Sequence, residues 1–165
     1  MLDEVTLVST EMILGPNLHR EAECEAVLRS VPQWFGIEES LREYVAASRR
    51  LPTFAWEEDR TLVGFLSLKE HFPQSWEISC IAVRNEARGQ RIGSKLLAHA
   101  EHWLRRQGVR LLQVKTLADQ DPSPEYAETR RFYVSRGFMA LEVFPELWSP
   151  ANPALQMVKV LNAID

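Results

Sequence analysis

Cysteine is scarce in this sequence, which has two in 165 residues, Cys24 and Cys80. They stand far apart and form no CxxC pair, and their neighbours are apolar or helix-forming. This spacing gives no basis for a structural zinc site or a disulfide framework, so we expect two reduced thiols. A free cysteine is usually a small buried apolar residue, and a catalytic role for either one is the minor alternative.

Long apolar runs and an excess of positive charge are also absent. No run of about 18 uncharged apolar residues occurs, and the first ten residues resemble no signal peptide. The formal net charge is −4, which gives no general electrostatic basis for binding nucleic acid. We therefore expect a cytoplasmic protein with no membrane or nucleic-acid partner, and the acidic background favours a cationic substrate.

Repeats and low-complexity linkers are missing as well. A length of 165 residues, with 45% hydrophobic and 25% charged, fits one globular domain over residues 1–165. The periodicity of apolar residues predicts the order strand, helix, helix, three strands, helix, strand, helix and two strands. The expected strands are Val5 to Met12, a hairpin over 53–72 that turns at 57–60, 75–83, 110–117, 138–144 and 154–161; the helices are 15–32, 37–51, 92–107 and 125–137.

Two of these expectations concern strand geometry. The helix at 92–107 joins strands 75–83 and 110–117, so these strands should lie parallel in a β-α-β unit. Simple alternation in SWEISCIAV places Glu77 on the same face as Ile81 and Val83. A proline-containing excursion from Pro145 to Pro153 should separate the last two strands.

The segment RNEARGQRIGSKLL (84–97) places two glycines and several cations directly before the helix that begins at Ile92. The first turn of a helix has free backbone N–H groups and a partial positive charge, so this loop can hold an anion. It matches neither GxxxxGK[ST] nor GxGxxG. The alternative is an ordinary strand-to-helix connection with solvated arginines.

A second segment, TRRFYVSRGF (129–138), places Tyr133 late in a short helix that ends at Gly137. Together with VRNEARGQRIGSKLLAHAEHWLRRQGV, it resembles the GNAT superfamily of acetyl-CoA-dependent N-acetyltransferases, over nearly the whole chain. The resemblance implies an α/β (α+β) fold of the GNAT type. Such a fold has a mixed, mostly antiparallel sheet with a central, splayed parallel strand pair, flanked by about four helices.

The resemblance also implies where acetyl-CoA would bind. In this family an R/Q-x-x-G-x-G/A loop holds the coenzyme A pyrophosphate, and the splayed strand offers main-chain groups to the pantetheine. The corresponding residues are Ile81, Val83, Arg88, Gly89, Gln90, Arg91, Ile92, Gly93 and Ser94. Arg91 replaces the middle glycine, and we expect a negative φ there, a guanidinium near phosphate and weaker coenzyme binding after Arg91→Gly. Tyr126 stands where many members have asparagine.

The same resemblance suggests the catalytic groups. Tyr133 matches the tyrosine that many members use as general acid toward the departing thiolate; the alternative is a tyrosine that only packs against the cofactor. Glu77 matches a position where some relatives place a base, and a salt bridge or plain solvation is the alternative. His71 is a lesser candidate for lining the site.

Other residues have weaker functional readings. Trp34 and Phe35 lie between the two N-terminal helices and suggest an aromatic wall of the acceptor pocket, whereas Trp148 is more typical of a core. His99 and His102 lack a third ligand, so we expect no metal.

The sequence therefore predicts an N-acetyltransferase that moves acetyl from acetyl-CoA to a primary amine of a small molecule in a ternary complex. A protein or peptide acceptor is the first alternative, and a non-catalytic acyl-CoA sensor is the second. A homodimer is common among such proteins, and the sequence does not decide the oligomeric state.

Overall fold

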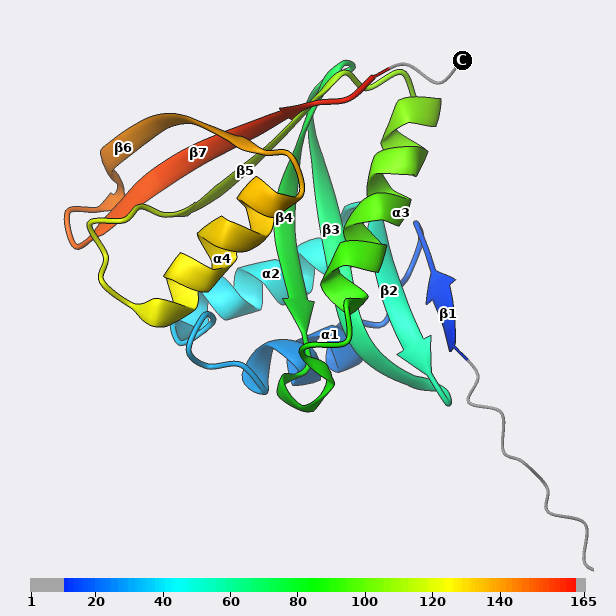
Figure 1. The fold of residues 1–165 in the computed structure, drawn as a ribbon. Coiled ribbons are helices and arrows are strands. Elements are labelled where there is room, and N and C mark those ends of the chain that lie inside the picture. Colours follow the sequence, from blue (N-terminus) through cyan, green and yellow to red (C-terminus); the bar gives the residue numbers. More distant parts are fainter. Residues whose placement is uncertain (1–10, 163–165) are drawn as a thin grey trace, which may run out of the picture.

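The computed structural model describes residues 11–162, and the elements follow the predicted order (Figure 1). The strands are β1 (Glu11–Leu14), β2 (Thr53–Glu58), β3 (Thr61–Phe72), β4 (Ser75–Val83), β5 (Leu111–Leu117), β6 (Met139–Ser149) and β7 (Asn152–Val160). The helices are α1 (Glu21–Arg29), α2 (Glu38–Arg50), α3 (Ile92–Arg106) and α4 (Pro124–Ser135), with a 3-10 turn at Asn85–Ala87. Most of the strand expected from Val5 to Met12 lies outside the described residues.

Seven strands form one sheet in the order β1-β2-β3-β4-β5-β7-β6. Strands β4 and β5 are parallel, and the other neighbouring pairs are antiparallel. Helices α3 and α4 lie on one face and α1 and α2 on the other (Figure 1), each over its own apolar core. The predicted mixed, mostly antiparallel sheet with four helices and one parallel pair is confirmed.

The parallel pair separates soon after it forms. β4 and β5 pair from Ser75 opposite Leu111 to Glu77 opposite Gln113 and no further. Beyond this point β4 stays with β3 and β5 stays with β7, so the two strands diverge into a V (Figure 1). Their facing edges therefore have main-chain N–H and C=O groups without a partner strand, which a ligand with amide groups can use.

A β-bulge changes the facing of residues along β4. Ser67 of β3 pairs with Cys80 and Leu68 pairs with Ile78, so Ser79 is an extra residue on β4. Such a bulge breaks the alternation of side chains between the two faces. The residues that follow Ser79 therefore point to the face opposite to the one that simple alternation predicts.

The two apolar cores show the consequence of this bulge. Residues before it pack in the core under α3, and residues after it pack with α1 and α2: Trp76 and Ile78 in the first group, Cys80 and Ala82 in the second. Ile81 and Val83 contact the core on the α3 side. The prediction that Glu77 shares their face is wrong. It assumed strict alternation of side chains along β4, and the extra residue Ser79 breaks that alternation.

The helix that follows β4 has the predicted apolar stripe. Its buried positions include Ile92, Leu96, Leu97, Ala100 and Leu104, at the spacing of one helical face. The chain leaves α3 through Gly108, whose φ of 80° is a conformation that glycine adopts without strain. This packing fixes the start of α3 beside the open end of the V.

None of the helices in residues 11–162 has the length and apolarity to cross a bilayer.

The last hairpin differs from the prediction. β6 continues through Pro145 to Ser149, where an excursion was expected. Its pairing with β7 jumps from Phe144 opposite Ala154 to Ser149 opposite Asn152, so β6 has extra residues between these two pairs. Proline is tolerated there because β6 is the edge strand and needs no donor on its outer side.

Candidate active site

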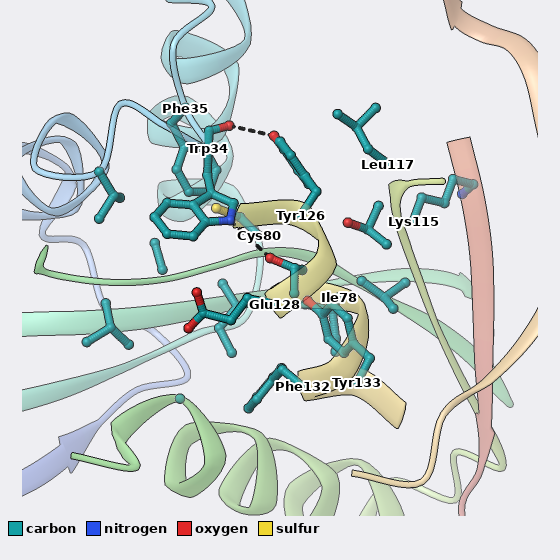
Figure 2. A pocket seen from close by; sticks show the side chains of 18 of the residues that line it. Trp34, Phe35, Ile78, Cys80, Lys115, Leu117, Tyr126, Glu128, Phe132 and Tyr133 are labelled. Atoms are coloured by element: carbon teal, nitrogen blue, oxygen red, sulfur yellow. Dashed lines mark hydrogen bonds between the residues drawn. The ribbon is translucent and has the colours of Figure 1, made fainter. Parts of the chain in front are cut away.

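A cavity of about 820 Å³ occupies the V between β4 and β5. Its walls come from both strands, the start of α3, α4, the α1–α2 loop and the β6–β7 hairpin (Figure 2). This volume falls in the range of sites that hold small molecules and cofactors. The splayed sheet therefore creates a binding site of the size that a substrate arm and an acceptor need.

Most of the predicted site residues line this cavity. The lining includes Ile81, Val83, Arg88, Gly89, Arg91, Ile92, Gly93, Ser94 and Tyr133, together with Trp34 and Phe35. Gln90, Glu77 and His71 are not part of it. The end of β4, the loop before α3 and Tyr133 of the second segment thus meet around one space.

The first turn of α3 offers unpaired donors to this space. The first hydrogen bond of the helix runs from the Lys95 N–H to the Arg91 carbonyl, at 3.0 Å. The N–H groups of Ile92, Gly93 and Ser94 precede that bond, and no side chain caps the helix. Free amides at the positive end of a helix dipole are a suitable cradle for phosphate.

Arg91 adopts a left-handed backbone, with φ 62° and ψ 19°, as the residue that caps the start of α3. The prediction of a negative φ is therefore wrong. The chain turns sharply between the 3-10 turn and α3, and glycine at this position of the motif would make that turn without a Cβ clash. Arginine makes the same turn at a cost of about 1–2 kcal/mol in backbone strain.

Replacing Arg91 with glycine should have opposite effects on stability and on coenzyme binding. Relief of strain should raise the free energy of unfolding by up to about 1 kcal/mol, measured by urea denaturation. Loss of an exposed charge near the phosphate should weaken coenzyme A binding by about 1 kcal/mol or less, measured by calorimetry. Arg91→Gln is the matched control, because it loses the charge but keeps the strain. A glycine variant no more stable than the glutamine variant would contradict the strain.

Arg88 links three parts of the cavity wall. Its Nη2 donates to Glu128 Oε1 of α4 at 3.0 Å, and its guanidinium carbon lies 4.0 Å from the centre of the Trp34 ring. A guanidinium has five N–H donors, and only Nη2 takes part in this bond, so the other donors can meet a phosphate placed at the start of α3. Arg88 can therefore contact a bound phosphate while it keeps Glu128 as its partner.

The α1–α2 loop is tied to α4 across the opening. Trp34 Nε1 donates to Thr129 Oγ1 at 3.0 Å, and the Tyr126 hydroxyl donates to the Trp34 carbonyl at 3.0 Å (Figure 2). Tyr126, which replaces the expected asparagine, thus holds this loop over the cavity. The loop and α4 form an aromatic strap on the α1–α2 side of the V.

Tyr133 is a buried side chain in the cavity wall. It is 3% exposed, and its ring contacts that of Phe132 (Figure 2) and that of Phe138, with centroids 5.3 Å apart in both pairs. Burial raises the pKa of its hydroxyl above the usual value of about 10. The hydroxyl therefore stays protonated at neutral pH.

Glu77 lies just behind the lining, in an ion pair. Its Oε2 accepts a hydrogen bond from Lys115 Nζ at 2.7 Å, and its Oε1 lies 2.8 Å from His71 Nε2. Its side chain is 13% exposed. Lys115 lines the cavity and Glu77 does not, so the carboxylate is linked to the cavity only through its ion pair with Lys115. This is the salt bridge that the sequence left open as the alternative.

Cys80 also lines the cavity, and both cysteines are buried and free. Burial raises the pKa of the Cys80 thiol, and it raises that of Cys24 to about 11. A neutral buried thiol is a poor nucleophile. Neither cysteine has the environment of a reactive thiolate.

Several other residues of the wall were not predicted as site residues. These are Tyr44, Lys115, Thr116, Glu128, Leu147, Trp148 and Asn152. Trp148 was expected in the core, but 48% of it is exposed. Lys115 had one local signal, a cation within a largely apolar strand. The others lie on α2, β5, α4 and the β6–β7 hairpin, and no motif marks them.

No group of three metal-ligating side chains occurs within residues 11–162. His99 packs edge-on against Phe54, with the ring centroids 4.9 Å apart. His99 thus packs at the edge of a core through Phe54, and both His99 and His102 are exposed.

Comparison with known proteins agrees with this geometry. The sequence profile of the acetyltransferase (GNAT) family matches residues 20–138, while comparison with curated protein sequences gave no match. Among solved structures, a protein from Desulfovibrio desulfuricans assigned to the GNAT family of acetyltransferases superposes with a TM-score of 0.79 at 20% identity, covering 93% of this chain and 100% of the other.

Two further structures have the same fold with different acceptors. The ribosomal-protein-S18-alanine N-acetyltransferase from Escherichia coli gives a TM-score of 0.76 at 16% identity, over 94% of this chain and 97% of the other. An aminoglycoside 6'-N-acetyltransferase complexed with coenzyme A gives a TM-score of 0.73 at 18% identity, over 93% of this chain and 99% of the other. The chain belongs to the GNAT acetyltransferase family and is an acyltransferase. This family uses acetyl-CoA and acts on amines of small molecules or proteins.

Proposed function

We propose that the protein transfers the acetyl group of acetyl-CoA to a primary amine of a small molecule, by direct attack in a ternary complex. The observation that carries this proposal is the single cavity that extends from the free amides of Ile92–Ser94 along the open edge of β4 to Tyr133. A pyrophosphate, an amide-containing arm and a thioester follow one another in the same order along acetyl-CoA.

The cofactor would be held mainly by main-chain groups. The amides of the segment from Arg88 to Ser94 would bind the pyrophosphate, with Gln90 at its outer edge and Arg88 and Arg91 supplying charge. Main-chain groups at Ile81 and Val83, which have no partner strand on that side, would bind the pantetheine amides. Such fixed donors also suit the thioester oxygen, where negative charge develops during attack.

The reaction requires two proton transfers at this site. The nitrogen of the neutral amine forms a bond to the acetyl carbon, and the bond from that carbon to sulfur breaks. Tyr133 donates its proton to the departing thiolate and regains one from solvent. Glu77 accepts the proton that the nitrogen loses, through a water, because Lys115 lies between the carboxylate and the cavity.

Two features support direct attack and a small acceptor. Cys80, the cysteine in the wall, has a neutral thiol, so an acetyl-cysteine intermediate is disfavoured. The aromatic strap, in which Tyr126 of α4 holds Trp34 of the α1–α2 loop, narrows the part of the cavity proposed for the acceptor. A narrow site favours a small molecule over a protein chain.

Steady-state kinetics with Glu77→Gln tests this proposal. With acetyl-CoA and amine both varied, initial rates of thiol release should give intersecting double-reciprocal lines; parallel lines would indicate an acyl-enzyme and contradict direct attack. Loss of the base should lower kcat/KM by about 10²-fold or more and remove the acid limb of its pH profile. Glu70→Gln is the charge-matched control, because Glu70 is exposed on β3 opposite Trp76 and lies outside the lining of the cavity. A variant with an unchanged pH profile would rule out Glu77 as the base.

A further inference from the structure

We infer that the acceptor is a monoamine with an apolar or aromatic body and no second cationic group. This inference rests on the proposed function and concerns the acceptor end of the same cavity. Three observations lead to it: the aromatic walls of that end, the apolar side chains left exposed at its mouth, and the absence of a free carboxylate among the described residues that line it.

Aromatic rings form the wall on the side of α2. Phe35 packs edge-on against Tyr44, with the ring centroids 5.7 Å apart. Trp34 lies beside them, held by its hydrogen bond to Thr129 (Figure 2). Each ring is fixed by a partner within the protein. A flat or apolar group can therefore pack against this wall without a further loss of side-chain freedom.

Large apolar side chains remain exposed where the cavity opens. Ile37 is 62% exposed, Leu147 is 53% exposed and Trp148 is 48% exposed, and all three line the cavity. Ile37 directly precedes α2, and the other two belong to β6. An acceptor with an apolar body would cover them, which is the favourable term in binding such a ligand.

The charges of the lining disfavour a polycation. Its charged members within residues 11–162 are Arg88, Arg91, Lys115 and Glu128. The single carboxylate, Glu128, is bonded to Arg88, and Lys115 is bonded to Glu77. A second ammonium on the acceptor would lose water without gaining an anionic partner, which is unfavourable. The chain has a net charge of −4, but the lining of the cavity has more cations than carboxylates. The acidic background of the sequence is therefore no argument for a polycationic acceptor.

Cation–π contacts do not compensate for the missing carboxylates. The guanidinium of Arg88 already lies over the Trp34 ring, at 4.0 Å from its centre.

The same surroundings help the reaction of a monoamine. Apolar walls and the nearby cation of Lys115 both favour the neutral form of a bound amine, which is the nucleophile.

A matched pair of acceptors tests this inference. Hexylamine and 1,6-diaminohexane share a carbon chain and differ by one amine, and 2-phenylethylamine adds an aromatic body. We expect kcat/KM for hexylamine and 2-phenylethylamine to exceed that for the diamine by about tenfold or more at neutral pH, where the diamine carries an extra charge. Equal or faster acetylation of the diamine or of spermidine would overturn the inference while leaving the proposed function intact.

Binding separates the two ideas if no amine is acetylated. Each amine is titrated by calorimetry into the protein saturated with coenzyme A. Binding of hexylamine but not of the diamine, without turnover, would support the acceptor class and contradict the proposed acetyl transfer. Absence of both binding and turnover for the monoamines would overturn the acceptor class.

A carboxylate added where the cavity opens should reduce the preference of the enzyme for a monoamine over a diamine. Ile37→Glu and Trp148→Glu each add a carboxylate at an exposed position, so the ratio of kcat/KM for hexylamine to that for the diamine should fall several-fold. Val134→Glu is the control, because Val134 is 61% exposed on α4 and lies outside the lining. A ratio that stays constant in both mouth variants, or falls equally in the control, would overturn the placement of the acceptor.

Discussion

Replacing Tyr133 with phenylalanine should slow acetyl transfer by about 10²–10⁴-fold, the range that removal of a general acid produces. The variant loses only the hydroxyl, while the ring contacts with Phe132 and Phe138 stay. Coenzyme A affinity and thermal stability should therefore change little. The measurement is single-turnover transfer by rapid quench, with calorimetry for the cofactor.

The pH dependence of the wild-type rate gives a second test of this role. Burial raises the pKa of the Tyr133 hydroxyl, so the acid form persists as pH rises past the usual tyrosine value of about 10. Ionisation of Tyr133 should therefore cause no fall in rate below that pH. Tyr44→Phe is the matched control, because Tyr44 also lines the cavity and burial raises its pKa to about 12. Equal losses in both variants, or none in Tyr133→Phe, would rule out the acid role.

Gly93→Asp should abolish most coenzyme A binding, with a loss in affinity of about 100-fold or more, because like charges brought together cost several kcal/mol. A side chain fits at this position: a Cβ on Gly93 would lie 3.8 Å from the Phe132 ring and 3.9 Å from Val83. An aspartate in the first turn also suits the helix dipole, so the fold should be kept.

Gly93→Asn separates charge from size in this experiment. Asparagine has nearly the same shape as aspartate but no charge, so it should bind coenzyme A far more tightly than the aspartate variant does. Calorimetric titration of both variants at low and high salt measures the difference, which should shrink as salt screens the repulsion. Equal affinities would mean that the pyrophosphate does not bind at the start of α3.

Much of the fold followed from local sequence patterns. The strand at Ser75–Val83 and the start of α3 at Ile92 were predicted to the residue, because alternation, helical spacing and the glycine after α3 all agree there. The turn between β2 and β3 was also visible as a short charged break. These elements depend on neighbours in sequence, which a pattern can register.

The errors concern features that depend on distant contacts. The bulge at Ser79 is set by pairing with β3, and it moves Glu77 away from the face of Ile81 and Val83. The left-handed backbone of Arg91 is imposed by the turn that joins β4 to α3, against the preference of arginine. Proline in β6 is tolerated because that strand lies at the edge of the sheet, a position that the sequence alone does not reveal.

The candidate site divides in the same way. The cofactor end was predicted, because a helix start and the loop before it form one continuous segment. The acceptor end joins the α1–α2 loop, α4 and the β6–β7 hairpin, which are far apart in sequence. Only Trp34 and Phe35 were foreseen there, and their contacts with Arg88, Thr129 and Tyr126 required the three-dimensional structure.

The central claim is that acetyl passes from acetyl-CoA to an amine in the cavity between β4 and β5. Mass spectrometry after incubation with acetyl-CoA labelled in its acetyl group, together with 2-phenylethylamine, measures this directly. The account predicts labelled acetyl on the amine nitrogen in an amount equal to the free coenzyme A thiol released. Intact acetyl-CoA and no labelled product with this amine, with hexylamine or with peptide N-termini would contradict it.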